Sequence, residues 1–248
     1  MMKRSSLFVI CSVIVASLLF SSCASAPQKI RVATDPTWPP FEKIDEQTQI
    51  VEGIDIDLIN AIAAKEGLVI DFVAVPFETL KIGLAQCQYD AAISSITITE
   101  DRKKDFSFSE SYFEAGQIVT VRKDNADIQG KDSLTGKTVG AEAGTTGADE
   151  AGKIPGAKLV TVDDIDILFQ NLMNGEVDAV IADNPLAMNY VAKNPDKLKT
   201  VGIIFTGEQY GIAVCKTNTA LLDKINKGLA AVKTEGGIDQ ITSKWMGK

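Results

Sequence analysis

Residues Ala91–Arg102 carry side chains suited to holding a small carboxylate. An apolar, strand-like run ends in the hydroxyl residues Ser94, Ser95 and Thr97, and Arg102 follows within one short turn. Hydroxyl and backbone groups donate single hydrogen bonds, whereas a guanidinium can hold a carboxylate through two parallel ones. The alternative is an ordinary strand followed by a solvated turn, because charged residues surround the arginine.

Two further segments place polar and aromatic residues just beyond expected strands. Asp35 and Trp38 lie in a proline-rich turn after the run 30–33, and Phe77 follows a later strand. A loop at a strand end can aim such side chains into a cleft, where the rings would form walls. In the alternative interpretation the two aromatic residues belong to the core, and Asp35 satisfies the turn.

The segment Val139–Gly147 follows another expected strand and opens a helix. Free N–H groups at a helix start, beside the hydroxyls of Thr145 and Thr146, can bind an anion. Glu142 lies just before them. The alternative is plain capping by either threonine, with Glu142 exposed. No GxGxxG pattern occurs, so a dinucleotide site is unsupported.

Asp183, Asn184 and Pro185 form a second strand-to-helix junction. Asn184 is the expected N-cap, and Pro185 is the expected first helical residue. That assignment leaves Asp183 to meet a cation such as an α-ammonium group, unless it shares the capping.

The elements that would position these residues alternate between strands and helices. Apolar residues recur at helical spacing over 54–65, with Gly67 as the stop, and 69–75 is β-branched and alternating. The pattern predicts a βαβαβ arrangement, and hence an α/β fold with mostly parallel sheets covered by helices.

This arrangement occurs twice. Residues 84–93 have a counterpart in 172–181, each reading as a helix end, a tight turn and an Asp-Ala step into an apolar strand. We therefore expect two similar α/β lobes facing a shared cleft, because open α/β sheets bind ligands at the carboxyl ends of their strands. The apolar runs 116–122 and 210–214 are the expected crossings, which would form a two-strand hinge.

The N-terminus has the pattern of an export signal. Lys3 and Arg4 precede an apolar stretch, 7–20, that is shorter than the roughly 20 residues a spanning helix needs. Small residues directly before Cys23 resemble the lipobox of bacterial lipoproteins, although Phe20 occupies the usual leucine position. We expect a signal peptide over 1–22, lipidation at Cys23 and a tether over 23–28, with simple secretion as the alternative.

Composition narrows the function classes. Without Lys3 and Arg4, 23 basic residues face 33 acidic ones, a net charge of −10, which argues against nucleic acid as a partner. The chain has no histidine and no CxxC, so we expect no metal, no cofactor and no histidine triad. Cys87 and Cys215 lie far apart in sequence. A single bridge between them is possible, but two buried thiols is the expected state.

Taken together, the motifs of this chain resemble the polar amino-acid-binding proteins of bacterial ABC importers. They are T-D-x-x-W-P-P-F, E-G-I-D-I-D-L, Y-D-A-A-I-S-S-I-T-I-T-E-D-R, G-K-T-V-G-A-E-A-G-T-T-G, N-G-E-V-D-A-V-I-A-D-N-P and S-K-W-M-G, in the family's order from Ile30 to Gly247. The resemblance implies the type II periplasmic-binding fold, with lobe 1 over 29–115, lobe 2 over 116–209 and a return to lobe 1 over 210–248. It also implies a membrane permease as partner, and a monomer exported to the periplasm or cell surface.

By the same resemblance, Arg102 binds the ligand carboxylate with help from Ser95, Thr97 and the turn at Thr145 and Thr146. Asp183 binds the α-ammonium group. Trp38 and Phe77 sandwich the ligand side chain, and Asp35 and Glu142 reach its far end.

The two carboxylates Asp35 and Glu142 decide the expected ligand. In a closed cleft they repel each other unless a donor lies between them, and a guanidinium or ammonium side chain supplies that donor. Aromatic walls add cation–π attraction. We therefore rank arginine, lysine or another basic amino acid first, glutamine second, and glutamate and aspartate last.

Two other functions stay open. Some proteins that look like this family are cyclohexadienyl dehydratases, which need a general acid such as Glu142 or Asp35 in the cleft. Asp183 argues against this activity, because it matches the ammonium-binding position of amino-acid binders. The second is a sensor that reports its ligand to a receptor. No kinase, transmembrane or cyclase segment follows in the sequence, so we expect signalling to need a separate partner.

Overall fold

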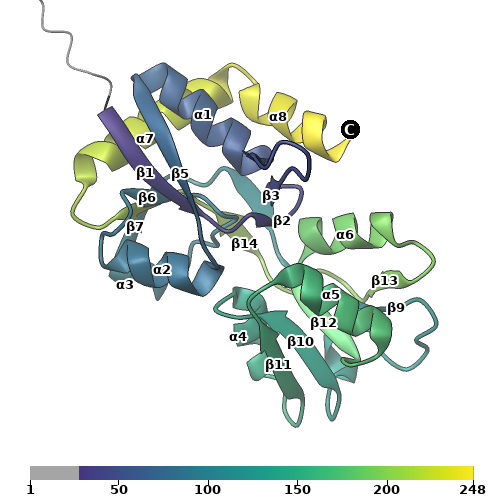
Figure 1. The fold of residues 1–248 in the computed structure, drawn as a ribbon. Coiled ribbons are helices and arrows are strands. Elements are labelled where there is room, and N and C mark those ends of the chain that lie inside the picture. The colour runs from purple at the N-terminus through teal and green to yellow at the C-terminus, as the bar shows by residue number, and fades with distance from the viewer. Residues whose placement is uncertain (1–27, 248) are drawn as a thin grey trace, which may run out of the picture.

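The computed structural model describes residues 28–247, which form two α/β lobes lying side by side (Figure 1). The expected signal peptide and Cys23 lie outside the described residues. Within residues 28–247, no helix is both long and apolar enough to cross a membrane.

The first lobe is built on a five-stranded sheet flanked by helices. Its strands are β1 (Gln28–Thr34), β5 (Leu68–Ala74), β6 (Ala91–Ala92), β7 (Phe106–Phe108) and β15 (Ala213–Cys215), and its helices are α1 (Ile54–Glu66), α2 (Phe77–Ala85), α3 (Arg102–Asp105), α7 (Thr219–Thr234) and α8 (Gly237–Met246). The strand order is β5-β1-β6-β15-β7, with β1, β5 and β6 parallel. Side chains alternate across β1, so that Ile30 and Val32 join the core with α1 and α7, and Ala33 joins the core with α2.

The second lobe repeats this plan. Its strands are β9 (Gln117–Arg122), β10 (Thr138–Glu142), β11 (Lys158–Val162), β12 (Ala179–Asp183) and β13 (Leu198–Val201), and its helices are α4 (Thr146–Gly152), α5 (Ile165–Asn174), α6 (Asn184–Lys193) and the 3-10 turn η1 (Lys131–Ser133). The order is β11-β10-β12-β9-β13, and β10 is parallel to both of its neighbours. The prediction of two similar lobes with mostly parallel sheets is confirmed, although each sheet also carries antiparallel strands on one side.

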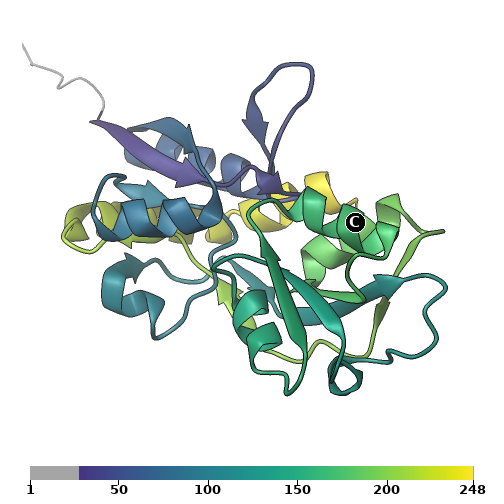
Figure 2. The same ribbon diagram turned by 60° about the horizontal axis from the view of Figure 1, so that its bottom comes forward.

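A separate pair of short strands links the lobes. β8 (Phe113–Ala115) and β14 (Glu208–Tyr210) run antiparallel, with Glu208 opposite Ala115. The expected crossing strands were 116–122 and 210–214, but residues 117–122 lie inside the second sheet and residues 213–215 inside the first. The crossing pair therefore precedes both expected runs. Figure 2 shows the hairpin of β3 (Glu42–Ile44) and β4 (Val51–Glu52) projecting from the first lobe, and β2 (Thr37–Trp38) pairs with β3.

Local signals placed the first helix well. The structure has α1 at Ile54–Glu66, one residue longer than predicted. Gly67 ends it with φ 64°, a left-handed conformation that favours glycine, and its N–H donates to the carbonyl of Ala63.

Cys87 and Cys215 form a disulfide, so the expectation of two buried thiols is wrong. Cys87 lies exposed after α2, and Cys215 lies buried at the end of β15, with Cα atoms 5.1 Å apart. The two residues are 128 positions apart because the whole second lobe lies between them in sequence. Only the return of β15 into the first sheet brings them together.

Candidate functional site

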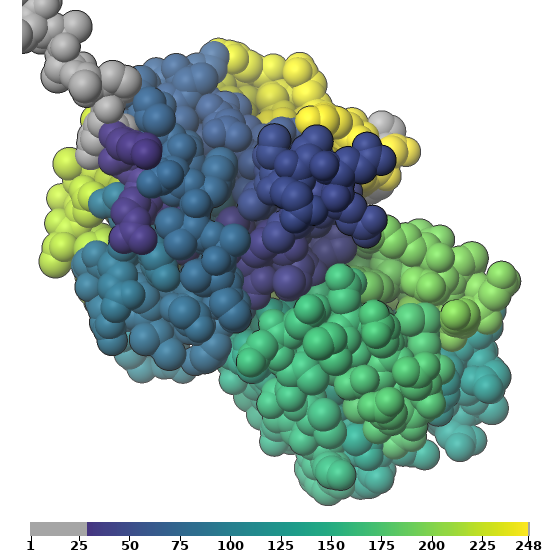
Figure 3. All heavy atoms as spheres, viewed as in Figure 1, coloured from purple at the N-terminus to yellow at the C-terminus, as the bar shows by residue number. Residues whose placement is uncertain are grey.

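A buried cavity lies where the two lobes meet. The lobes touch along a continuous seam (Figure 3), and the cavity lies between them. All the predicted ligand-contact residues line it, together with one that the sequence analysis missed, Glu42. The lining comprises Asp35, Trp38, Glu42, Phe77, Ser94, Ser95, Thr97, Arg102, Glu142, Thr145, Thr146 and Asp183.

Asp35 follows β1 and points into the cavity from the first lobe. Its Oδ2 accepts from the backbone N–H of Phe77 at 2.7 Å, and its Oδ1 accepts from Thr37 Oγ1 at 3.0 Å. Its own N–H donates to Ser94 Oγ at 2.9 Å. Burial raises the pKa of Asp35 to about 6, although these hydrogen bonds oppose the shift. The carboxylate of Asp35 therefore accepts hydrogen bonds from the neighbouring turn and also lines the cavity.

Glu42 is the lining residue that sequence reasoning missed. It is fully buried, and its Oε1 accepts from Ser94 Oγ at 3.2 Å. Burial, the neighbouring charge of Asp55 and the hydrogen bond that the Glu42 carboxyl donates to Asp55 raise the pKa of Glu42 well above the usual value. The sequence feature that could have predicted this position is the proline-rich turn after Trp38. Strand pairing across this turn sets Glu42 opposite Trp38, so the two side chains lie on the same face.

Asp55 lies behind Glu42 in the first turn of α1. Its Oδ2 accepts from the backbone N–H of Ser95 and from the hydroxyl of Tyr112, both at 2.8 Å. These bonds hold the strand-to-turn segment around Ser95, whose φ is 47°. The hydroxyl of Ser95 has no partner among residues 28–247. It is therefore available to a ligand.

Arg102 is held by backbone carbonyls from both lobes. Nη1 donates to the carbonyl of Thr97 at 2.8 Å, and Nη2 donates to the carbonyl of Gly144 at 3.1 Å. The guanidinium carbon lies 5.4 Å from the ring centre of Phe77. Burial lowers the pKa of Arg102, and the charges of Asp183 and other carboxylates oppose that shift. The side chain is pre-positioned for an anion in the cavity.

Asp183 ends β12 on the opposite lobe. It is itself the N-cap of α6, so the prediction that Asn184 caps this helix is off by one residue. Its carboxylate makes no capping bond, and accepts instead from Gln117 Nε2 and Tyr210 OH. Burial and the charge of Glu208 raise the pKa of Asp183 to about 7.

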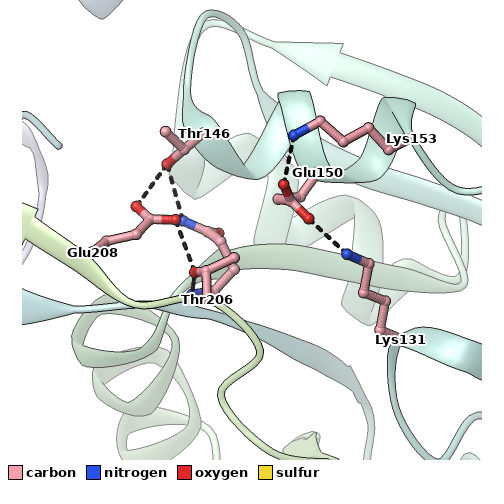
Figure 4. A network of polar contacts seen from close by, with 7 residues as sticks. Lys131, Thr146, Glu150, Lys153, Thr206 and Glu208 are labelled. Atoms are coloured by element: carbon pink, nitrogen blue, oxygen red, sulfur yellow. Dashed lines mark hydrogen bonds and ion pairs between the residues drawn. The ribbon is translucent and has the colours of Figure 1, made fainter. Parts of the chain in front are cut away.

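The β10–α4 turn supplies the remaining second-lobe residues. Thr145 caps α4, and its Oγ1 accepts from the N–H of Ala148 at 3.2 Å. Thr146 turns instead toward Glu208, as Figure 4 shows. Glu142 is 2% exposed, so the alternative that it points outward is wrong. Burial and the charges of Asp35 and Asp183 raise its pKa well above the usual value, and its Oε2 has no partner in the described chain.

The arrangement of charge is strongly one-sided. Among the described residues that line the cavity, Arg102 is the one basic side chain, and four are carboxyl groups. Glu42 shares a hydrogen bond with Asp55, whereas Glu142 Oε2 is buried without a donor among residues 28–247. Buried acceptors without donors are costly. The cavity can therefore take a molecule with one anionic group for Arg102 and several N–H donors elsewhere. No cluster of metal-binding side chains occurs within residues 28–247.

A fold of two α/β lobes with this cavity at their junction defines a ligand-capturing protein rather than a structural module. The chain belongs to the bacterial extracellular solute-binding proteins, family 3, whose sequence model matches residues 30–248. Its place is therefore extracytoplasmic.

Individual relatives support the assignment. The chain is 35% identical over 239 residues to ABC transporter arginine-binding protein 1 of Escherichia coli, covering 94% of this chain and 97% of that one. A solved structure of an ancestral arginine-binding protein bound to arginine matches with TM-score 0.84 and 42% identity, covering 89% and 99% of the two chains. A structure of an ancestral arginine-binding protein bound to glutamine matches with TM-score 0.82 and 42% identity, covering 89% and 98%.

Proposed function

We propose that this protein captures a free basic amino acid, arginine or lysine first and glutamine second, for an ABC importer. The observation that carries the proposal is the buried, unpartnered acceptor Glu142 Oε2, in a cavity that four carboxyl groups line and whose one basic group among the described lining residues is Arg102. A cationic side chain would supply the missing donor and offset the carboxyl charges. A glutamate or aspartate ligand would add a further negative charge.

In the proposed pose, the ligand spans both lobes. Arg102 and the unpartnered hydroxyl of Ser95 hold the carboxylate. The hydroxyl of Ser94 accepts from the backbone N–H of Asp35 and donates to Glu42, and so positions both residues. Asp183 holds the α-ammonium group. Trp38 and Phe77 enclose the aliphatic stem, and the carboxyl groups of Asp35, Glu42 and Glu142 receive the cationic end. The residue roles rest on the family resemblance together with the shared cavity.

Transport would follow from closure. Arg102 belongs to the first lobe and Asp183 to the second, and the strands β8 and β14 form the link between them. A ligand that contacts both residues binds the closed form more tightly than the open one, and so shifts the population toward it. A membrane permease would then recognise the closed shape. We infer a monomer and no catalytic role.

A thermal-shift series tests the proposal. The protein without residues 1–22 is screened against the twenty amino acids, ornithine and prephenate. A ligand specific for the native state adds about 2.7 kcal/mol at a hundredfold excess over its Kd. A selective rise with arginine, lysine or ornithine supports the proposal, and Arg102→Ala should abolish it. A rise with glutamine alone would remove the argument from Glu142. A rise with prephenate alone would favour the dehydratase alternative.

We also propose that the exported chain is anchored by a lipid on Cys23. The support is the run of small residues before this cysteine. Cys23→Ser in the full-length chain should move the protein from the membrane fraction to the soluble one. An unchanged distribution between fractions would favour simple secretion.

A further inference from the structure

A carboxylate lies behind the ligand cavity, at the hinge. Glu208 begins β14 and is only 9% exposed. It does not line the cavity, but lines an outer groove between the lobes. Thr97 and Thr146 line both the cavity and the groove. The two threonines therefore separate Glu208 from the ligand.

Glu208 accepts hydrogen bonds from the hydroxyls of both threonines. Its Oε2 accepts from Thr97 Oγ1 of the first lobe and from Thr146 Oγ1 of the second, each at 2.8 Å. Its Oε1 accepts from Thr206 Oγ1 at 2.9 Å, and Figure 4 shows Thr146 and Thr206 turned toward this carboxylate. A carboxylate can only accept, and a threonine hydroxyl has one proton to donate. Both protons are therefore committed away from the cavity.

The direction of these bonds sets what the threonines offer to a ligand. Because each hydroxyl already donates its hydrogen bond to Glu208, it has only lone pairs left to offer a ligand. Gln117 Nε2 donates both to Thr146 Oγ1, at 3.2 Å, and to Asp183, which places these two acceptors side by side. Lone pairs beside a carboxylate attract an ammonium group and repel an anion.

We propose that Glu208 is a positioning residue for the α-ammonium group of the ligand. By accepting one hydroxyl from each lobe, it makes Thr97 and Thr146 acceptors that complete the site of Asp183. By family resemblance, Thr97 and the turn at Thr145 and Thr146 help Arg102 to bind the ligand carboxylate, whereas here the hydroxyls of Thr97 and Thr146 serve the ammonium group. The inference rests on the proposed binding of basic amino acids.

Three ligands separate the two roles. Agmatine keeps the amine of arginine but lacks its carboxylate, and 5-guanidinopentanoate keeps the carboxylate but lacks the amine. Arginine and the two analogues are each titrated calorimetrically into the wild type and into Glu208→Met, whose side chain has a similar length but no oxygen. The affinity of a weakly binding ligand is measured by displacing it with arginine. Arginine and agmatine should bind at least about tenfold more weakly to the variant, whereas 5-guanidinopentanoate should change less than about twofold.

Two further variants complete the test. Glu208→Gln should restore binding to within about threefold, because its amide oxygen can accept from both threonines while its NH₂ faces Thr206. Thr146→Val, an isosteric change, should weaken arginine and agmatine and spare 5-guanidinopentanoate, and it serves if Glu208→Met does not fold. An equal loss for all three ligands, or a loss that spares agmatine, would overturn the inference. Absence of arginine binding by the wild type would instead remove the proposed function.

Discussion

Arg102 of the first lobe donates a hydrogen bond to the carbonyl oxygen of Gly144 in the second lobe, 3.1 Å away across the cleft. Lys81 Nζ donates to the same oxygen at 2.7 Å. Gly144 has φ +73°, and a Cβ there would lie 1.8 Å from Glu78 Oε2 and 2.5 Å from Lys81 Nζ. Two cations of one lobe thus converge on one backbone carbonyl of the other, and a Cβ at that position would displace the end groups of Glu78 and Lys81.

We therefore expect Gly144→Ala to weaken ligand binding by opposing closure. Arginine affinity should fall about threefold to tenfold, since Lys81 and Glu78 must move and a hydrogen bond to a charged group is lost. Gly136→Ala is the matched control, because its φ is +74° and nothing lies within 4 Å of its Cβ. Both variants carry the same left-handed strain, about 1–2 kcal/mol. Equal arginine affinities in calorimetry would contradict the closing role of this contact.

Glu142→Gln tests the acceptor at the far end of the cavity. The change keeps the shape of the side chain and removes its charge, so arginine should bind at least about tenfold more weakly, because a charge-assisted hydrogen bond becomes a neutral one. Glutamine affinity should change much less. The preference for arginine over glutamine, measured by titration of both ligands, is the quantity to compare. A preference that does not change would show that Glu142 does not meet the ligand's side chain.

Arginine binding should weaken as pH falls. The pKa of Asp35 is raised to about 6 and that of Asp183 to about 7, and a bound cation would lower both. Binding therefore releases protons, and below pH 7 these protons must be displaced before the cation can bind. We expect the Kd to rise about tenfold or more between pH 8 and pH 5, by proton linkage. Calorimetry in buffers of different ionisation enthalpy measures the proton release directly. A Kd independent of pH would show that these carboxyl groups do not meet a cation.

The disulfide should support stability and leave binding alone. It closes a loop across 128 residues, so replacing both Cys87 and Cys215 with serine should lower the free energy of unfolding by about 2–4 kcal/mol. Neither residue lines the cavity, so the Kd for arginine should stay within about twofold. Denaturant titration and calorimetry of the same variant check the two parts. A large loss of affinity would mean that the bridge positions α2, and with it Phe77.

The sequence predicted most of the residues that line the cavity, because the ends of apolar strands can be recognised from the sequence pattern. Hydroxyl and acidic residues at the ends of apolar strands, such as Ser94 in the first lobe and Asp183 in the second, lie at the ligand-binding edge of their own sheet. Which of these residues contact a ligand is still a prediction. The position of Glu142 in the cavity also depended on lobe packing, which local pattern does not specify.

Three of the misses share one cause, since each depends on pairing between distant or antiparallel segments. Glu42 enters the cavity only because β2 and β3 pair across a tight turn. Cys215 meets Cys87 only because β15 returns to the first sheet after the second lobe. The link between the lobes is a short strand pair, too short for periodicity to mark.

Comparing arginine with citrulline tests the central claim most directly. Citrulline has nearly the shape of arginine, but a neutral ureido group replaces the guanidinium, so the two ligands differ mainly in charge at the end that Asp35, Glu42 and Glu142 would receive. Calorimetric titration of both at pH 8 should give a Kd for arginine at least about a hundredfold lower, or about 2.7 kcal/mol. Equal affinities, or tighter binding of citrulline, would contradict selection of a cationic side chain by these carboxyl groups.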